Sequence, residues 1–564
     1  MLRPRFASKQ HEVCAFLVYM YSNNLVVTNN SYEYKMKSLD EILEKQFPLC
    51  HTFRDVTEDG IIFYDGKAHF AFFISPKQET LLCEYLESHF KIQRELTKDE
   101  QVIIESFDTF RQAGLFLLGP LQQVSPVDEK ELGKLIQYYH DNVLQRKYVL
   151  EASEDCNFRC TYCFNTIHEG TDLRHHTKRN MSFEIAKKSI DYYFDQYVKI
   201  FKKLSNEKQK VLLEAVPPTL SWYGGETTLN WNVVVVATEY FKSKPWAESG
   251  IDPHSLNFSL NTNMAVMTDD MLNFLVENDY MIFASLDGPK EENDKCRVFP
   301  NNEGTYEVVM KNLRKIKKLD PDYFKRKVSI LSVEAETHDV QKCRDYFEHW
   351  EFPELDVSAN EQEKEECVYS NPSLELAEQQ KMYASDLKEY KAIIDSANLD
   401  NIGKELSTLI KYTHLNFTNP HGSDTLHISL TCPMGIDNNM IGVDGNIHIC
   451  HKTDGSYPFA NIHSTPLDYS KLVKLYKEHN ECVNQHCYDC WAIHVCGICG
   501  AKRLKNGTFR NPTPQECDVI RGDRHLILSA LLYTALKRPE LYLQLKKKKE
   551  ELKDYIPVID INSF

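Results

Sequence analysis

The sequence predicts an α/β protein whose largest unit is a partial (β/α)6 TIM-like barrel, with a small N-terminal α+β module and a cysteine-rich C-terminal module. Three observations predict this architecture. Between residues 147 and 360, short apolar runs alternate with amphipathic stretches of helical period, which is typical of βαβ units and a parallel sheet. Before them, IIFYDGKAHFAFFIS has the aromatic runs and central Asp-Gly of a β-hairpin. After them, the cysteines are grouped rather than scattered.

Length and charge limit the classes of protein that this chain can belong to. Its 564 residues are too many for one compact domain and favour about three modules. Lys and Arg number 66 against 82 Asp and Glu, a formal charge of -16, so we expect neither a nucleic acid nor an anionic membrane as a partner. No apolar run approaches the roughly 18 residues that span a bilayer. The basic start MLRPRF is not followed by a signal-peptide cleavage site, so we expect a cytoplasmic protein.

Residues 1–120 are predicted to form the N-terminal module. CAFLVYMY and NLVV favour short strands, and Asp65-Gly66 is the expected hairpin turn. TLLCEYLESHF and ESFDTFRQAGLFL have helical period, and Gly114 is expected to end the second helix before a short apolar strand. This order indicates a winged-helix-like α+β unit, and a helix over about 128–144 leads into the next module.

Residues 147–360 are predicted to form the barrel, and Ser182 is placed to cap its first long helix. In a parallel barrel, chemistry is expected at the carboxyl ends of the strands. The expected strands are KYVLEAS, TLSWYGGE, FSLNTNM, MIFASLDG, VSILSVE and LDVSAN. A linker containing the helix LELAEQQKMYASDLKEYKAIIDSA follows over 361–424, then the cysteine-rich module over 425–522 and C-terminal helices over 523–564.

A trio of cysteines directly follows the first barrel strand. EDCNFRCTYCF places Cys156, Cys160 and Cys163 in the order CxxxCxxC. Three soft thiolates this close suit an iron–sulfur cluster or zinc, and three ligands leave one metal position open. Two alternatives remain at this point: zinc with a distant fourth ligand, and three unliganded core thiols.

The trio and the residues at the ends of the next strands resemble the radical S-adenosylmethionine (SAM) superfamily. The resemblance implies that the trio holds a 4Fe–4S cluster whose open iron binds SAM, and that a reduced cluster cleaves SAM to a 5′-deoxyadenosyl radical. Two glycines let the backbone approach a ligand, a carboxylate suits an ammonium group, and an arginine fork matches a carboxylate. Taken singly, each polar residue is better explained as a loop cap or a surface ion pair, but together, in order along one barrel, they make that explanation improbable. Relatives commonly have glycine where this chain has Met264. By the resemblance, SAM is contacted by Tyr162, Phe164, Gly224, Gly225, Glu226, Asn263, Ser285, Asp287 and Arg297.

The second group of cysteines has the pattern Cx12Gx4C, then CxxCx5CxxC, then a single cysteine. The central run alone also suits zinc. The whole pattern resembles the SPASM extension of radical SAM enzymes, which carries two auxiliary 4Fe–4S clusters and brings the expected total to three. By that resemblance, auxiliary cluster I is held by Cys432, Cys450 and Cys499. Auxiliary cluster II is held by Cys487, Cys490, Cys496 and Cys517.

This group departs from its relatives in two ways. Two residues, rather than three, separate the last pair of the central run. Asp437 and Asn438 stand where some relatives have a further cysteine, so auxiliary cluster I has either an open iron or a ligand borrowed from Cys482 or His451. An unliganded Cys482 is an equal alternative.

The resemblance implies an enzyme that modifies peptides. The N-terminal module resembles the leader-binding element of enzymes that mature ribosomally synthesised (RiPP) precursor peptides, and would add the leader as an extra strand. A structural cap on the barrel is the alternative for this module. We expect a thioether or carbon–carbon crosslink in the peptide, with flavodoxin or ferredoxin as the electron donor. The rival functions are an anaerobic sulfatase-maturating enzyme, which forms formylglycine, and a non-catalytic zinc scaffold.

Overall fold

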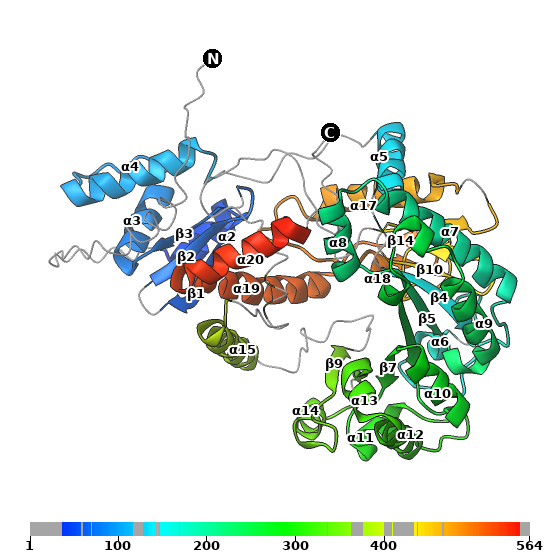
Figure 1. The fold of residues 1–564 in the computed structure, drawn as a ribbon. Coiled ribbons are helices and arrows are strands. Elements are labelled where there is room, and N and C mark those ends of the chain that lie inside the picture. Colours follow the sequence, from blue (N-terminus) through cyan, green and yellow to red (C-terminus); the bar gives the residue numbers. More distant parts are fainter. Residues whose placement is uncertain are drawn as a thin grey trace.

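Six parallel strands run in chain order through the central sheet of the computed structural model (Figure 1). Each neighbours the next, which confirms the six strands that the sequence predicts. They are β4 (Lys147–Ser153), β5 (Thr219–Gly224), β6 (Asn257–Thr262), β7 (Met281–Ser285), β8 (Val328–Glu334) and β9 (Asp356–Glu361). The structure describes residues 37–57, 60–68, 70–116, 128–142, 144, 147–168, 170–335, 337–361, 376–399, 406, 409, 434–436, 438–464 and 467–552.

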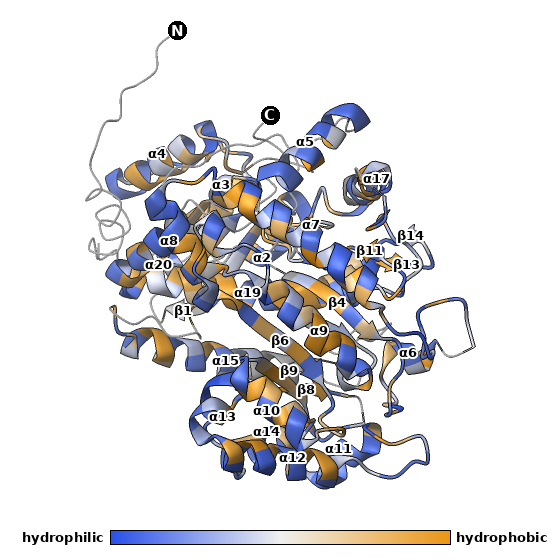
Figure 2. Ribbon diagram, turned by 45° about the vertical axis from the view of Figure 1, so that its right-hand side comes forward, coloured by the Kyte–Doolittle hydropathy of each residue, from blue (hydrophilic) through white to orange (hydrophobic). Residues whose placement is uncertain are grey.

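Helices between the strands cover one face of this sheet (Figure 2). The first of them begins where Ser182 accepts a hydrogen bond from the backbone N–H of Ile185, as the sequence predicts. The principal helices of this layer are α7 (Phe183–Phe201), α9 (Trp231–Lys242), α10 (Asp269–Glu277), α12 (Tyr306–Leu319) and α14 (Val340–His349). Shorter ones are α6 (Phe164–Ile167), α8 (Asn206–Ala215), α11 (Lys290–Cys296) and α13 (Pro321–Lys327).

The two faces of the sheet differ in polarity because side chains alternate along each strand. Trp222 and Leu260 are buried in the main apolar core with the helices. Ser221 and Ser259 are partly exposed on the other face, where their hydroxyl oxygens lie 2.9 Å apart. The face without helices is therefore the polar inner face of the partial barrel.

The predicted C-terminal module contributes three strands to the same sheet. β10 (Asn438–Ile441) pairs in parallel with β4, and β11 (Asn446–His448) and β12 (Ala460–Asn461) follow in antiparallel order. The sheet order is therefore β12-β11-β10-β4-β5-β6-β7-β8-β9. The sequence did not predict that β10 pairs with β4, because parallel pairing between segments almost 300 residues apart leaves no local signal. The rest of the module comprises α17 (Ser470–His486), α18 (Gly500–Arg503), β13 (Leu504–Lys505) and β14 (Thr508–Phe509).

A second, three-stranded sheet lies in the N-terminal part of the chain. It comprises β1 (Cys50–Thr57), β2 (Gly60–Asp65) and β3 (Phe70–Ile74), with helices α2 (Leu39–Gln46), α3 (Pro76–Glu87) and α4 (Lys98–Gln112). The predicted hairpin is β2–β3, but Asp65 pairs with Phe70, so the turn is longer than the Asp-Gly dipeptide. Gly114 has a φ of 103° just beyond the end of α4, as predicted. The runs CAFLVYMY and NLVV lie outside the described residues, and the winged-helix-like assignment stays a prediction.

The two faces of this small sheet pack against opposite ends of the chain. Phe63 and Phe72 pack with α3 and α4 in one apolar cluster. Tyr64 and Phe73 lie in a second cluster with the C-terminal helices, which Figure 1 shows beside the strands. Those helices are α15 (Leu376–Ser396), which the sequence predicts, α19 (Pro514–Lys537) and α20 (Pro539–Leu552). The first and last parts of the described chain thus share one core.

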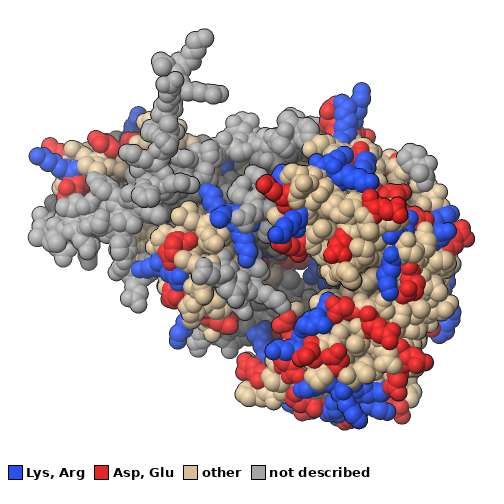
Figure 3. All heavy atoms as spheres, viewed as in Figure 1, with Lys and Arg blue, Asp and Glu red and all other residues tan. Residues whose placement is uncertain are grey.

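Charged side chains of both signs lie on the surface of the described residues. On the face in Figure 3, acidic and basic side chains are interspersed over the described residues. α5 (Glu129–Asn142), the predicted connecting helix, forms an ion pair with α17 in which Glu129 Oε1 lies 2.6 Å from Lys477 Nζ. None of the helices in the described part of the chain is long and apolar enough to cross a bilayer.

Candidate functional site

The cysteine trio lies in the loop that joins β4 to α6, at the carboxyl end of the first barrel strand. Two backbone hydrogen bonds fix this loop to the segment after α11: Arg159 N donates to Val298 O at 2.8 Å, and Thr161 N donates to Cys296 O at 3.0 Å. Burial and the negative charge of a Cys163 thiolate raise the pKa of the Cys160 thiol to about 12, although the positive charge of Arg297 acts to lower it. The three thiols are therefore neighbours in one loop, in which Cys160 is buried and Cys156 and Cys163 are partly exposed.

Gly224 and Gly225 bring the end of β5 against the start of the cysteine loop. Gly224 has a φ of +142°, and a Cβ added to it would lie 2.3 Å from Ser153 O. A Cβ on Gly225 would lie 2.3 Å from Asp155 O. Gly225 N donates to Ser153 O at 2.7 Å. The role of these glycines toward a bound ligand stays a prediction. In the structure they approach the backbone just before Cys156.

Glu226 is buried beside these glycines, with 1% of its surface exposed. Its Oε1 accepts hydrogen bonds from the hydroxyls of Thr228 and Thr262, both at 2.7 Å, and its Oε2 accepts one from Asn263 N at 2.7 Å. Burial raises the pKa of this carboxyl, and the hydrogen bonds lower it. The carboxylate thus ties the ends of β5 and β6 together, and its predicted role toward an ammonium group stays a prediction.

Asn263 links β6 to the trio. Its side-chain amide donates to Asn157 Oδ1 at 2.7 Å and lies 3.7 Å from Cys156 Sγ. The next residue, Met264, is fully buried with a φ of 61°, a region that favours glycine. This backbone geometry explains why glycine suits the position, and Asn312 stabilises it by donating to Met264 O at 2.6 Å.

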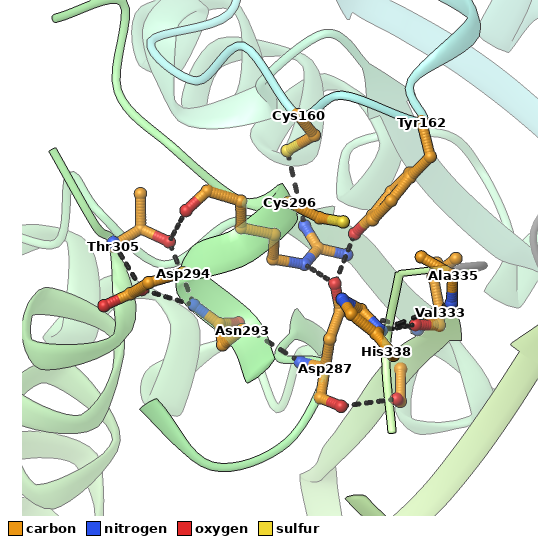
Figure 4. Close-up of polar contacts among 12 residues, drawn as sticks. Cys160, Tyr162, Asp287, Asn293, Asp294, Cys296, Thr305, Val333, Ala335 and His338 are labelled. Carbon is orange, nitrogen blue, oxygen red and sulfur yellow. Dashed lines mark hydrogen bonds and ion pairs between the residues drawn. The ribbon is translucent and has the colours of Figure 1, made fainter. Parts of the chain in front are cut away.

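Arg297 lies between a buried carboxylate and a cysteine of the trio. Figure 4 shows Cys160 and Tyr162 on one loop, with Asp287 across from them. Its Nε is 3.0 Å from Asp287 Oδ2, and its Nη1 is 4.0 Å from Cys160 Sγ. The Tyr162 hydroxyl donates to the same Asp287 oxygen at 2.6 Å, and the guanidinium carbon is 5.5 Å from the centre of the Tyr162 ring. A network of predicted residues from two loops thus holds one positive charge beside the trio.

Two residues beside this network were not among the predicted site residues. Cys296 Sγ lies 3.1 Å from Thr337 Oγ1, and contacts with His338 and Thr161 lower the pKa of this thiol although burial alone raises it. His338 Nδ1 lies 3.0 Å from Val333 O. The adjacency of Cys296 to Arg297 is the only sequence signal for it, while His338 comes from the loop after β8 and gives none.

Asp294, in contrast, has a structural role. Its Oδ1 accepts hydrogen bonds from the backbone N–H groups of Thr305 at 2.8 Å and Tyr306 at 2.9 Å, where α12 begins. A negative charge is favourable at a helix N-terminus.

Ser285 and Phe164, two further predicted SAM contacts, are both partly exposed. Ser285 is the last residue of β7 and is partly exposed, in alternation with the buried Ala284. Phe164 begins α6, and the guanidinium carbon of Arg174 lies 5.0 Å from the centre of its ring.

Arg174 connects the barrel to the predicted auxiliary region. Its Nη2 lies 2.5 Å from Glu151 Oε1 in a buried ion pair, and its Nη1 donates to His451 O at 2.6 Å. The His451 ring lies 4.7 Å from the ring of Tyr223, which immediately precedes Gly224. The loop that carries Cys450 therefore lies against the carboxyl end of β5.

Four of the second group of cysteines come together around the turn after α17 and the start of α19. Burial, together with the charges of Cys496, Cys490 and Cys517, raises the pKa of Cys487 to about 12. Burial and the charge of Cys490 raise the pKa of Cys496 to about 11. The structure thus places the four predicted ligands of auxiliary cluster II, which we call the cysteine quartet, in one neighbourhood.

The predicted ligands of auxiliary cluster I are only partly visible. Cys432 and Asp437 lie outside the described residues, Cys450 follows β11, and Cys499 immediately precedes α18. Cys482 Sγ contacts the side chains of Arg503 and Asn511 and lies near Cys487 of the quartet. Its contacts therefore place it beside the quartet, and the fourth ligand of auxiliary cluster I stays a prediction.

The donor chemistry of both thiol groups fits iron–sulfur clusters. Three or four thiols of a cluster each bind a different iron, whereas a zinc ion draws all its thiolates to within about 2.3 Å of itself. Among the described side chains, no group of three or more His, Cys, Asp or Glu is arranged to hold one metal ion. The trio, which offers three thiols beside Arg297 and Asn263, suits a cluster that leaves one iron for another ligand.

Comparisons with known proteins agree with this geometry. Residues 150–339 match the family model of the radical SAM superfamily. A cysteine-type anaerobic sulfatase-maturating enzyme of Clostridium novyi is 27% identical over 175 residues, which are 30% of this chain and 40% of that protein. The radical SAM cyclopropyl synthase TigE of Paramaledivibacter caminithermalis is 21% identical over 168 residues, 29% of this chain and 32% of that protein. The match thus spans less than half the length of these curated relatives.

Solved structures give weaker likenesses over more of the chain. Native anSMEcpe with bound AdoMet and the Cp18Cys peptide covers 71% of this chain and 99% of its own, with a TM-score of 0.45 and 17% identity. Streptococcus suis SuiB bound to the precursor peptide SuiA covers 83% of this chain and 98% of its own, with a TM-score of 0.35 and 12% identity.

The family match covers β4 to β8 and the loops after them, which carry the trio, Gly225, Asn263 and Arg297. It implies SAM and a 4Fe–4S cluster as cofactors. The chain therefore contains a radical SAM domain over residues 150–339, and this domain indicates an enzyme.

Proposed function

We propose that this enzyme matures a ribosomally synthesised precursor peptide by installing a thioether or carbon–carbon crosslink. The observation that carries the proposal is that the trio, the Cys450 loop and the quartet with the N-terminal sheet are joined in one structure. The trio lies at the end of β4, Arg174 ties the Cys450 loop to the same strand ends, and the quartet packs on the N-terminal sheet. Relatives named as sulfatase-maturating enzymes and a cyclopropyl synthase support substrates of this class.

In this proposal the trio holds the cluster that binds SAM, and the network around it positions SAM. The cluster and SAM, when bound, supply the 5′-deoxyadenosyl radical that removes a hydrogen atom from the substrate. Arg297 faces the SAM carboxylate, and Asp287 and Tyr162 fix the guanidinium in place. Asn263 and Ser285 face the ribose from the ends of neighbouring strands, Phe164 flanks the adenine, and the segment Gly224–Glu226 faces the methionyl amine.

The remaining thiols serve the second half of the reaction. A crosslinked product is two hydrogens lighter than its precursor, because one leaves as a hydrogen atom and the other as a proton plus an electron. We assign acceptance of this electron to two auxiliary clusters, one held by Cys432, Cys450 and Cys499 and the other by the quartet. Flavodoxin or ferredoxin is the proposed source of the first electron, and the clusters total three.

The N-terminal sheet is the proposed site for the leader of the precursor. Among the described strands, β3 pairs with β2 on one side only. An extended peptide can add to such an edge through backbone hydrogen bonds. The winged-helix-like character of this module and its role in peptide binding belong to the same proposal.

The experiment uses anaerobically purified, reconstituted enzyme and short cysteine-containing peptides encoded beside its gene. With SAM and dithionite, the parent should produce 5′-deoxyadenosine and a peptide that is two hydrogens lighter. Cys160→Ala should abolish both products. A lighter peptide that forms at the parent's rate with Cys160→Ala contradicts the proposal.

The alternative function is oxidation of a cysteine or serine in a sulfatase to formylglycine. The names of two relatives support it. Incubation with cysteine- and serine-containing sulfatase peptides distinguishes it, because the product is then an aldehyde that reacts with hydrazides. Metal analysis decides against the zinc scaffold if the protein contains iron and sulfide rather than zinc.

A further inference from the structure

Tyr64 carries an orphaned hydroxyl in the contact between the N-terminal sheet and the cysteine quartet. It lies on β2 with 0% of its surface exposed, and its hydroxyl oxygen has no hydrogen-bond partner. Buried polar groups in native proteins nearly always have a partner, because an unsatisfied one costs about 1–3 kcal/mol. The Tyr64 hydroxyl is therefore able to donate a hydrogen bond to a partner that is not among the described protein atoms.

The Tyr64 side chain packs beside one cysteine of the quartet and the residue that follows it. Tyr64 and Cys490 pack in the same apolar cluster, and the Tyr64 ring lies 6.4 Å from the ring of Trp491 at an angle of 85°. A phenol hydroxyl can donate its proton to a nearby acceptor. The guanidinium of Arg521 also contacts Cys490.

The contact between the sheet and the quartet is tight. The His51 ring stacks on Trp491 with centroids 4.4 Å apart and planes at 5°. Gly66 lies so close that an added Cβ would be 2.2 Å from Trp491 O. This packing leaves the turn after Cys490 fixed against β1 and β2, so the position of the hydroxyl relative to the quartet is fixed as well.

The other polar group on this strand end has different partners. Asp65 lies on the opposite face of β2, because side chains alternate along a strand. Its carboxylate accepts hydrogen bonds from the backbone N–H groups of Lys67 and Ala68, both at 3.0 Å, and of Phe116 at 3.1 Å. Asp65 is thus satisfied within the N-terminal module, and the Tyr64 hydroxyl is left for the face that meets the quartet.

We propose that the Tyr64 hydroxyl donates a hydrogen bond to a sulfur of the iron–sulfur cluster held by Cys487, Cys490, Cys496 and Cys517. The N-terminal sheet is then part of the auxiliary cluster II site. This inference rests on the proposed function, since it needs a cluster at the quartet. Hydrogen bonds to cluster sulfurs stabilise the more negative, reduced state and raise the reduction potential. Docking of a peptide on this sheet would therefore act on an electron acceptor through one named contact.

The test compares Tyr64→Phe with Tyr148→Phe in the reconstituted full-length enzyme. Tyr148 is a matched control, because it is also buried on a strand with an orphaned hydroxyl, but its neighbours are Tyr192 and Tyr469 rather than cysteines. Redox titration monitored by electron paramagnetic resonance should show a lower potential for one cluster in Tyr64→Phe. Tyr148→Phe should titrate like the parent. Equal potentials in Tyr64→Phe and the parent, or equal shifts in both variants, overturn the hydrogen bond.

Two further measurements separate this inference from the function on which it rests. The double variant Cys487→Ala/Cys490→Ala should lose one cluster's iron and signal; if it keeps the parent's iron content, the proposed cluster is wrong. If Tyr64→Phe loads less iron than the parent, the hydrogen bond is instead tested in the parent enzyme. The parent should then show a proton that is coupled to the reduced cluster and disappears in deuterium oxide, and the absence of such a proton overturns the inference.

Discussion

The guanidinium of Arg297 and the carboxylate of Asp287 form an ion pair of 3.0 Å, with 8% and 0% of their side chains exposed. Such a pair costs desolvation energy, and removing one partner leaves an uncompensated buried charge. The pair therefore fixes where the positive charge beside Cys160 can lie.

Asp287→Asn should destabilise the protein by about 3–5 kcal/mol and reduce 5′-deoxyadenosine formation, because Arg297 loses the carboxylate that orients it. Thermal unfolding and product formation measure the two effects. The control is Glu351→Gln, which breaks a 2.6 Å pair with Arg314 whose side chains are 42% and 52% exposed. It should cost less than about 1 kcal/mol. Similar losses in both variants contradict the prediction.

Gly225→Ala should reduce iron binding at the trio. The new Cβ would meet Asp155 O at 2.3 Å, and the backbone just before Cys156 would have to move. Gly522→Ala is the control, because it lies in α19 with nothing within 4 Å of an added Cβ. Iron and sulfide content after reconstitution should fall in the first variant only; a fully loaded Gly225→Ala protein would show that the close approach is unimportant.

Arg174→Met should loosen the Cys450 loop and leave Glu151 as an unpaired buried carboxylate. We expect a loss of about 3–5 kcal/mol in the free energy of unfolding. Adding Glu151→Met should recover much of it, because a fully apolar replacement removes the buried charge as well. Denaturant unfolding of the two single variants and the double variant gives the coupling energy. Additive losses contradict a coupled pair.

His140 should make stability depend on pH. Burial lowers its pKa to about 4, against about 6.5 in an unfolded chain. The unfolded state therefore binds more protons between these values, so the stabilisation is complete above pH 6.5 and is lost as the pH falls toward 4. At pH 5.5 the loss is about 1 kcal/mol.

The measurement is the melting temperature between pH 7.5 and 5.5. His140→Phe, which can keep the stacking on Tyr469 at 4.3 Å, should fall less steeply than the parent. His254→Gln, at an exposed position, should follow the parent. Parallel curves for all three proteins rule out a contribution from His140.

Much of the barrel could be predicted because its signals are local. Strands such as KYVLEAS are short apolar runs, and Ser182 caps a helix through a contact within three residues. The spacing of Cys156, Cys160 and Cys163 is likewise a local pattern that one loop can satisfy. The hairpin was found for the same reason, although its turn is longer because Asp65 pairs with Phe70.

The roles of Gly225 and Glu226 could not be read from the same segment. Their residue types suggest a ligand, which stays a prediction, and the structure adds contacts of Gly225 with the Ser153 backbone and of Glu226 with the hydroxyls of Thr228 and Thr262. Whether a polar group meets a ligand or another strand depends on what lies opposite it in space.

The sequence by itself determined the radical SAM domain, the order of the six barrel strands and the grouping of the thiols, since these depend on residue type and short spacing. Only the tertiary structure decided that β10 extends the sheet beside β4, that both ends of the described chain share a core, and that Tyr64 faces the quartet. The physical reason is that packing between distant segments is chosen by the summed burial and hydrogen bonding of the whole fold, of which each segment carries only one side.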